Sequence, residues 1–186
     1  MTPRRFTLDE LNAMPPDEAA AALDGLYEHS PRFARAALAA RPFADLDQLL
    51  VALEAAVEAA GRDAQLALLR AHPQLAGKAM VAGTLTDESA GEQARSGLTH
   101  CTPEEFRRLH ELNDRYERRF GWPFILAVRG ADGQGLTRAQ VLHAFEQRVH
   151  ADPADEFAEC LRQVQRIAGW RLRDRIDPAG PPRAGA

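Results

Sequence analysis

Apolar residues recur along most of this chain at spacings of three and four, the pattern of one face of an α-helix. The clearest case follows Thr102-Pro103-Glu104-Glu105, a capping-box sequence with proline at the first helical position. The stripe after it consists of Phe106, Leu109, Asn113, Tyr116 and Phe120. Gly121 marks the end of this segment, which therefore predicts one amphipathic helix.

Similar start and stop signals predict helices along the rest of the chain. They predict a first helix at the capping box of Thr7 and Glu10, a helix from Pro16 to about Tyr27, and one from the Ser30 cap to before Pro42. Farther along, they predict helices over residues 46–60 after Asp45, from Asp63 to near His72, and over residues 87–96 after Thr86. Two more are expected over residues 138–149 after Thr137 and from Pro153 onward. Only WPFILAV has the pattern of a strand, and one strand cannot make a sheet. We expect an all-α, single-domain bundle of about eight or nine helices over residues 1–176, then a disordered tail over residues 177–186.

The composition indicates a globular protein. Of the 186 residues, 45% are hydrophobic and 27% are charged, and the formal net charge of −4 argues against nucleic acid as the main partner. The first residues lack the apolar run of a signal peptide, and no segment is apolar enough for a membrane span. Two cysteines make no disulfide framework, and from these features together we expect a cytoplasmic protein.

His72 is the first candidate for chemistry, because Pro73 follows it. A proline disfavours helical geometry at the preceding residue and lacks a backbone N–H, so the helix ends there. The imidazole is then held at a helix C-terminus with its ring able to point into a cleft, as proton transfer requires. The alternative is a structural histidine that contacts the last carbonyls and the helix dipole.

Two blocks downstream offer groups that could bind a ligand. In the predicted helix over residues 87–96, Ser89, Glu92 and Gln93 share one face and present a hydroxyl, a carboxylate and an amide. The alternative for this block is a solvated helix face. GWPFILAVRG, residues 121–130, is too short for a helix, so its buried backbone needs hydrogen-bond partners. A ligand rich in amide groups is one such partner, and a plain core connector is the alternative.

The sequence favours neither a metal nor an organic cofactor. His143 and His150 lie seven residues apart, and His100, Cys101 and His110 match no usual zinc spacing. The HExxH, CxxC, GxGxxG, phosphate-loop and serine-hydrolase motifs are absent from the sequence. The residues alone therefore indicate a helical domain with a candidate acid–base histidine.

Several blocks of the chain, taken together and in order, resemble one known family. They are YEHSPRFA (27–34), RPF (41–43), LLRAHPQLAGKA (68–79), LTDESAGEQ (85–93), LHELNDRYERRFGWPFILAVRG (109–130) and IAGWRL (167–172). On these motifs the chain is similar to the 2-oxo-4-hydroxy-4-carboxy-5-ureidoimidazoline (OHCU) decarboxylases, the last enzymes in the conversion of urate to (S)-allantoin. The resemblance covers about Leu8 to Arg175 and implies an all-α fold, a homodimer, and no metal or organic cofactor.

The resemblance also implies roles for individual residues. His72 matches the catalytic histidine, and Pro73 lines the site beside it. Ser89, Glu92 and Gln93 match the family's polar substrate-binding block. The stretch whose backbone holds the substrate ring corresponds here to Phe124, Ile125, Leu126, Ala127 and Val128. Arg171 matches the arginine of the closing motif. Departures from the family pattern at Arg32, Arg95-Ser96, Arg119 and Trp122 bear on pocket shape and dimer contacts more than on these residues.

For such a substrate we expect His72 to take the hydroxyl proton and to deliver a proton to the ring, which sets the S configuration. The C=N bond of the substrate accepts the electron pair, so no cofactor is needed. Glu92 would orient His72 or a substrate N–H, Ser89 and Gln93 would bond ureido and ring amides, and Arg171 would bind an anionic or carbonyl oxygen. The alternatives are a different cofactor-free enzyme acting on a related ureide or amide, and a non-catalytic helical ligand-binding protein.

Overall fold

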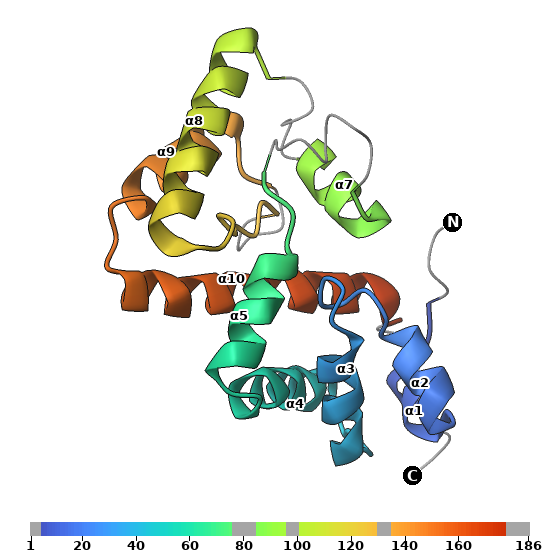
Figure 1. The fold of residues 1–186 in the computed structure, drawn as a ribbon. Coiled ribbons are helices and arrows are strands. Elements are labelled where there is room, and N and C mark those ends of the chain that lie inside the picture. The colour runs from blue at the N-terminus through green and yellow to red at the C-terminus, as the bar shows by residue number, and fades with distance from the viewer. Residues whose placement is uncertain (1–4, 76–84, 96–100, 130–134, 178–186) are drawn as a thin grey trace. The chain divides into compact units, whose positions relative to one another are not determined.

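The computed structural model describes residues 5–75, 85–95, 101–129 and 135–177, with the side chains of Gln93 and Arg95 left out (Figure 1). These residues form nine α-helices and one short 3-10 helix, η1. Their only β-type pairing is one isolated bridge between Phe6 and Ile176. The prediction of an all-α fold with eight or nine helices is therefore confirmed. None of the described helices is both long enough and apolar enough to span a membrane.

The helices follow the order that the sequence predicts. They are α1 (Leu8–Ala13), α2 (Pro16–Ala22), α3 (Pro31–Ala37), η1 (Leu38–Ala40), α4 (Leu46–Ala59), α5 (Arg62–Ala71), α7 (Asp87–Arg95), α8 (Pro103–Phe120), α9 (Arg138–Arg148) and α10 (Pro153–Arg175). Thr7, Thr102 and Thr137 each accept a hydrogen bond from the backbone N–H three residues on and complete a capping box. Gly121 ends α8 with a φ of 80°, a left-handed conformation that glycine adopts at little cost.

Two details of the N-terminal part differ from the prediction. Helix α2 ends at Ala22 rather than near Tyr27, because the chain turns through Leu23 and through Gly25, which has a φ of 78°. The Ser30 side chain makes no capping hydrogen bond, although Pro31 does occupy the first position of α3. Ser30 has a ψ of 58° instead of the extended conformation that orients an N-cap side chain toward the helix.

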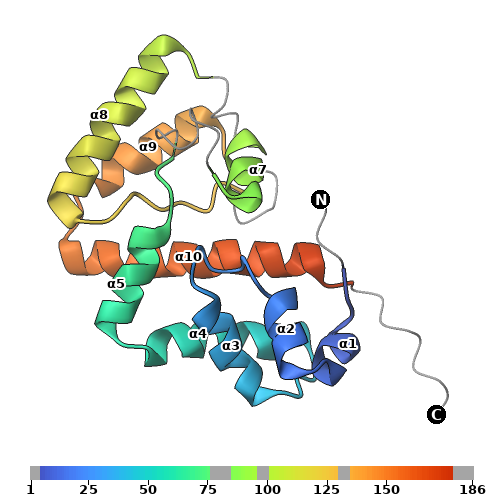
Figure 2. The ribbon, with the colours of Figure 1, turned by 45° about the vertical axis from the view of Figure 1, so that its right-hand side comes forward.

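The chain divides into two compact units. Unit 1 comprises residues 1–68 and 165–186, and unit 2 comprises residues 69–164. In unit 1, α3 packs against α4, and α2 contacts α1, α3 and η1 (Figures 1 and 2). The Phe6 N–H donates to the Arg175 carbonyl at 3.0 Å, and the Asp177 N–H donates to the Phe6 carbonyl at 2.9 Å. Asp177 is the first residue of the predicted tail, and the remainder of that tail lies outside the described residues.

Unit 2 contains α7, α8 and α9, the end of α5 and the first part of α10. Helix α9 packs against α8 (Figure 2). An aromatic cluster forms its core: the rings of Phe124 and Phe145 stack with centroids 3.9 Å apart, and Tyr116 meets both rings edge to face. All of the predicted site residues except Arg171 belong to this unit.

Candidate active site

His72 lies directly after the last residue of α5, as the sequence predicts. Its backbone N–H donates to the Leu69 carbonyl at 3.2 Å, and Pro73 ends the ladder beyond it. The side chain of His72 is buried, with 8% of its surface exposed, whereas Pro73 is half-buried. A buried imidazole at a helix end suits proton transfer, because its position is fixed and bulk water is largely excluded.

Side chains on both sides of His72 hold this turn against α8. The contacts are Arg70 Nε to the Gly121 carbonyl (3.0 Å), Gln74 Nε2 to Glu117 Oε2 (2.9 Å), and Asn113 Nδ2 to the Leu75 carbonyl (2.9 Å). Asn113 is buried, and its Oδ1 has no hydrogen-bond partner among the described residues. The sequence contained one signal for this contact, which is that Asn113 occupies a position on the otherwise apolar stripe of α8.

The polar block forms α7, as predicted, and Thr86 Oγ1 accepts the Ser89 N–H at 3.3 Å. Ser89 is buried, with 4% of its surface exposed, whereas Glu92 is half-buried. A solvated helix face does not account for a buried hydroxyl at Ser89. The side chain of Gln93 lies outside the described part of the structure.

Residues 122–128 are irregular and mostly buried, as predicted for this segment. Side chains of α9 and α10 bond part of its backbone: Arg148 Nη1 donates to the Ile125 carbonyl at 2.8 Å, and the Ala127 N–H donates to Gln163 Oε1 at 2.9 Å. The Val128 carbonyl accepts the Leu136 N–H at 2.7 Å. Arg148 and Gln163 were not among the predicted residues, because each is far from the segment along the chain.

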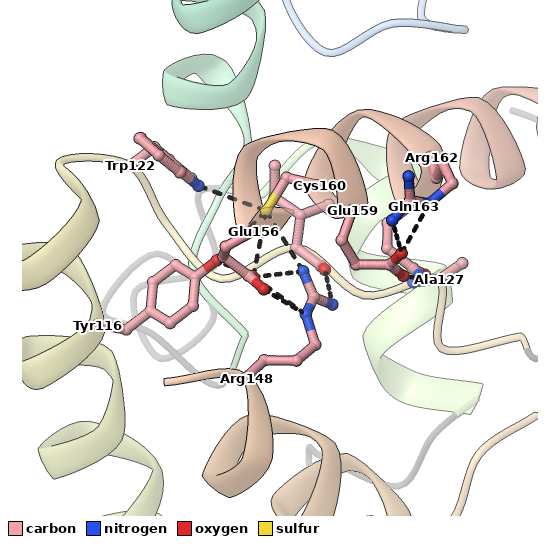
Figure 3. A network of polar contacts seen from close by, with 10 residues as sticks. Tyr116, Trp122, Ala127, Arg148, Glu156, Glu159, Cys160, Arg162 and Gln163 are labelled. Atoms are coloured by element: carbon pink, nitrogen blue, oxygen red, sulfur yellow. Dashed lines mark hydrogen bonds and ion pairs between the residues drawn. The ribbon is translucent and has the colours of Figure 1, made fainter. Parts of the chain in front are cut away.

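Arg148 belongs to a buried polar network in unit 2 (Figure 3). Its Nη2 lies 2.6 Å from Glu156 Oε1, and only 1% of the Glu156 side chain is exposed. Tyr116 donates its hydroxyl proton to the same carboxylate, and Trp122 Nε1 donates to Cys160 Sγ at 3.3 Å. Such a buried ion pair is tolerated only with well-placed hydrogen bonds around it, which this network supplies.

Burial determines the protonation of the network. It raises the pKa of the Tyr116 hydroxyl far above its ordinary value and also raises the pKa of the Cys160 thiol, so both keep their protons at neutral pH. Burial, the largest single influence, lowers the pKa of the Arg148 guanidinium, but the hydrogen bonds to Glu156 and the electrostatic attraction of the surrounding acidic groups together outweigh it, and the pKa is raised overall. The network therefore holds one cation against one carboxylate, with neutral donors around them.

Arg171 belongs to unit 1, whereas the other predicted site residues belong to unit 2. Its Nη1 donates to Glu28 Oε2 at 2.9 Å and to the Gly25 carbonyl at 3.0 Å. Both side chains of this ion pair are buried. An open groove of about 750 Å³ also lies in unit 1, between α3 and α4, and alanines with Arg32 and Phe33 line it rather than any predicted site residue.

Among the described residues, no group of three or more histidine, cysteine or acidic side chains is arranged to hold a metal ion. Cys101 and Cys160 are both free thiols. The arrangement in unit 2 thus offers a buried histidine, a buried hydroxyl and a segment of irregular backbone.

This all-helical chain belongs to a class of decarboxylases, because a family model described as OHCU decarboxylase matches its residues 12–173. A relative from Haloferax volcanii named 2-oxo-4-hydroxy-4-carboxy-5-ureidoimidazoline decarboxylase is 37% identical over 171 residues, 92% of this chain and 96% of the relative. A Mus musculus relative of the same name is 36% identical over 167 residues, 90% of this chain and 91% of the relative. The chain belongs to the OHCU decarboxylase family, and thereby to the carbon–carbon lyases.

A solved structure supports the same assignment. The crystal structure of an (S)-allantoin synthase superposes with a TM-score of 0.70 at 35% sequence identity and covers 92% of this chain. This chain covers 55% of that synthase, so it spans about half of the synthase's length.

Proposed function

We propose that this protein decarboxylates OHCU to (S)-allantoin without a cofactor. The observation that carries the proposal is the similarity over 92% of this chain to a relative named for OHCU decarboxylation. The buried His72 at the end of α5 supports a proton-transfer mechanism.

The proposed reaction can be balanced at the substrate atoms. The bond from the hydroxyl-bearing carbon to the carboxylate breaks and CO2 leaves. The electron pair of that bond forms a double bond to the neighbouring ring carbon, while the C=N nitrogen takes up a proton and becomes N–H. The hydroxyl carbon then loses its O–H proton and becomes a carbonyl, and the neighbouring carbon gains a proton. One proton from solvent is consumed overall, and the substrate's own C=N bond serves as the electron sink that a cofactor would otherwise supply.

His72 is the proposed carrier of these protons. It removes the hydroxyl proton and returns a proton to one face of the ring carbon, which makes the product the S enantiomer. Positioned proton transfer of this kind contributes about 10²–10⁴-fold to a rate. Glu92 is proposed to orient His72 or a substrate N–H, and the half-burial of its side chain on α7 is compatible with either role.

The other predicted residues keep their proposed roles in binding. Ser89 and Gln93 bind ureido and ring amides, Pro73 lines the site, and the backbone of residues 124–128 holds the ring. Support comes from the grouping of these residues with His72 in unit 2 and from the burial of Ser89. Arg171 remains a proposed ligand of a substrate oxygen, which would have to share the guanidinium with Glu28.

The homodimer and the cytoplasmic location that we expect from the sequence stay predictions. Light scattering on the purified protein measures the first directly: a mass of about twice 20.5 kDa is expected, and a mass near 20.5 kDa contradicts it.

Circular dichroism of freshly generated OHCU tests the proposed activity. OHCU is made from urate by the two upstream reactions and is followed with and without this protein. We expect rapid growth of the (S)-allantoin signal, whereas the spontaneous route gives racemic product with little final signal. The signal should persist after treatment with a metal chelator. No acceleration by protein with a native helical spectrum would overturn the proposal and favour a related ureide or amide as the substrate.

A further inference from the structure

We propose that Arg148 and Gln163 are positioning residues for substrate binding, because they fix the two peptide groups that flank Leu126. The inference rests on the proposed function, in which the backbone of residues 124–128 holds the substrate ring. Neither side chain needs to touch the substrate in this role. Each acts through the backbone that it bonds.

Arg148 fixes the first of these peptide groups. Its Nη1 donates to the Ile125 carbonyl at 2.8 Å, and its guanidinium lies over the Phe124 ring, 4.6 Å from the centroid. The rest of the guanidinium is bound to Glu156, with Nη2 at 2.6 Å from Oε1 and Nε at 3.2 Å from Oε2. One rigid, planar fork therefore connects a carboxylate of α10 to the segment, which lysine with a single point of charge could not do.

Gln163 fixes the second peptide group. Its Oε1 accepts the Ala127 N–H at 2.9 Å, while its Nε2 donates to Glu159 Oε1 at 2.5 Å (Figure 3). Because a carboxylate can only accept, Glu159 determines which end of the amide faces Ala127. Arg162 Nε in turn donates to Glu159 at 2.8 Å. The Gln163 amide is therefore held in the one orientation that accepts from the segment.

At Leu126, the two contacts leave one backbone donor and one backbone acceptor for a ligand. The peptides on both sides of Leu126 are trans, so the Leu126 N–H points away from the carbonyl that Arg148 holds, and the Leu126 carbonyl points away from the N–H that Gln163 holds. Leu126 is the one half-buried residue of 124–128, and its backbone makes no hydrogen bond among the described residues. An N–H and a C=O from one residue suit the amide-rich edge of a cyclic ureide.

The test compares Arg148→Lys and Gln163→Met with Arg108→Lys, a matched control. Arg108 also forms an ion pair, with Glu146 at 2.9 Å, but the two side chains of this pair are 48% and 43% exposed. Steady-state kinetics with OHCU are combined with hydrogen–deuterium exchange of the peptide spanning residues 122–129. We expect the two variants to raise KM about tenfold or more, to change kcat less, and to keep the pH profile of kcat. Exchange in residues 122–129 should become faster, and the control should match the wild type in both measurements.

Several outcomes decide the inference. Variants that only melt at a lower temperature, with wild-type KM and wild-type exchange in residues 122–129, overturn it and leave the two side chains a structural role. If Arg148→Lys does not fold, Gln163→Met decides alone, since it removes no buried charge. If the wild-type protein itself does not turn over OHCU, the proposed function fails. Exchange then decides the positioning claim separately: faster exchange supports it and unchanged exchange overturns it.

Discussion

The side-chain amide of Asn113 donates a hydrogen bond to the backbone carbonyl of Leu75, three residues after His72, at 2.9 Å. Asn113 is buried on the inner stripe of α8, and its Oδ1 has no partner among the described residues. A buried acceptor without a partner carries a desolvation cost. The hydrogen bond from Asn113 to the Leu75 carbonyl fixes the turn that bears His72, despite the cost of burying Oδ1.

Replacing Asn113 by alanine should therefore affect both stability and activity. The Leu75 carbonyl would lose its donor inside the protein, and we expect a loss of about 1–3 kcal/mol in the free energy of unfolding. Movement of the His72 turn should lower kcat about tenfold. Chemical denaturation and OHCU kinetics measure the two effects.

Asn12→Ala is the matched control for that experiment. Asn12 also bonds backbone, donating to the Phe43 carbonyl at 2.8 Å and accepting the Phe43 N–H at 2.9 Å, but in unit 1. Its loss should lower stability and leave the kinetics of the folded protein unchanged. Wild-type kcat in Asn113→Ala would contradict the role assigned to the Leu75 contact.

The capping box of α8 should make stability depend on acidic pH. The Thr102 backbone N–H donates to the Glu105 carboxylate, which lowers its pKa below the ordinary 4.5, and Arg138 adds to this effect. A carboxyl group whose pKa is lower in the folded state contributes stability that is complete above its unfolded-state pKa. This contribution is lost as the pH falls through the folded-state pKa. Glu105→Gln keeps an acceptor but removes the charge. We expect its melting temperature to fall below that of the wild type at about pH 7 and the two to converge at about pH 3. A difference that stays constant over this range would contradict the prediction.

Cys160 should make stability depend on alkaline pH. Burial raises the pKa of its thiol above the ordinary 9.0. The folded protein then keeps a proton that the unfolded chain loses, so this contribution is complete below the unfolded-state pKa and declines as pH rises, by at most about 1.4 kcal/mol per pH unit. In a Cys101→Ser background, Cys160→Ser should flatten the decline between about pH 8 and 9.5. Parallel declines in the two proteins would show that Cys160 does not contribute.

Arg171→Met should be strongly destabilising, because it removes the buried ion pair between Arg171 and the Glu28 carboxylate. The expected loss in unfolding free energy is about 3–5 kcal/mol. The double change Arg171→Met with Glu28→Leu should recover much of this stability, since it removes both buried charges. If the stabilised double variant regains full OHCU turnover, Arg171 has no role in binding the substrate.

Local signals explain why most of the fold could be predicted. Three helices start through contacts between residues three apart, so the sequence alone carries the information on where these helices begin. The N-cap residues are Thr102, Thr137 and Asp45, and each accepts the backbone N–H three residues on, at Glu105, Gln140 and Gln48. Ser30 shows the limit of such reasoning. Its residue type and the following proline fit a cap, but its backbone conformation depends on the preceding turn, where His29 has a φ of 47°.

The supports of the candidate site depend on contacts between distant parts of the chain. Glu156 reads from the sequence as an acidic residue in the first turn of a helix, where the helix dipole favours it. In the structure it is buried and paired with Arg148 and Tyr116, which is 40 residues away. No period or spacing in the sequence distinguishes such a residue from a solvated one. His72, by contrast, could be proposed because Pro73 fixes its helix end locally.

The most direct test of the proposed role of His72 is the His72→Asn variant, followed by circular dichroism during turnover of freshly made OHCU. The variant should keep the helical spectrum of the wild type, but its asparagine cannot carry a proton between the hydroxyl and the ring carbon. Its formation of (S)-allantoin should fall by about 10² or more. A folded variant that produces (S)-allantoin at close to the wild-type rate would contradict the central role of His72.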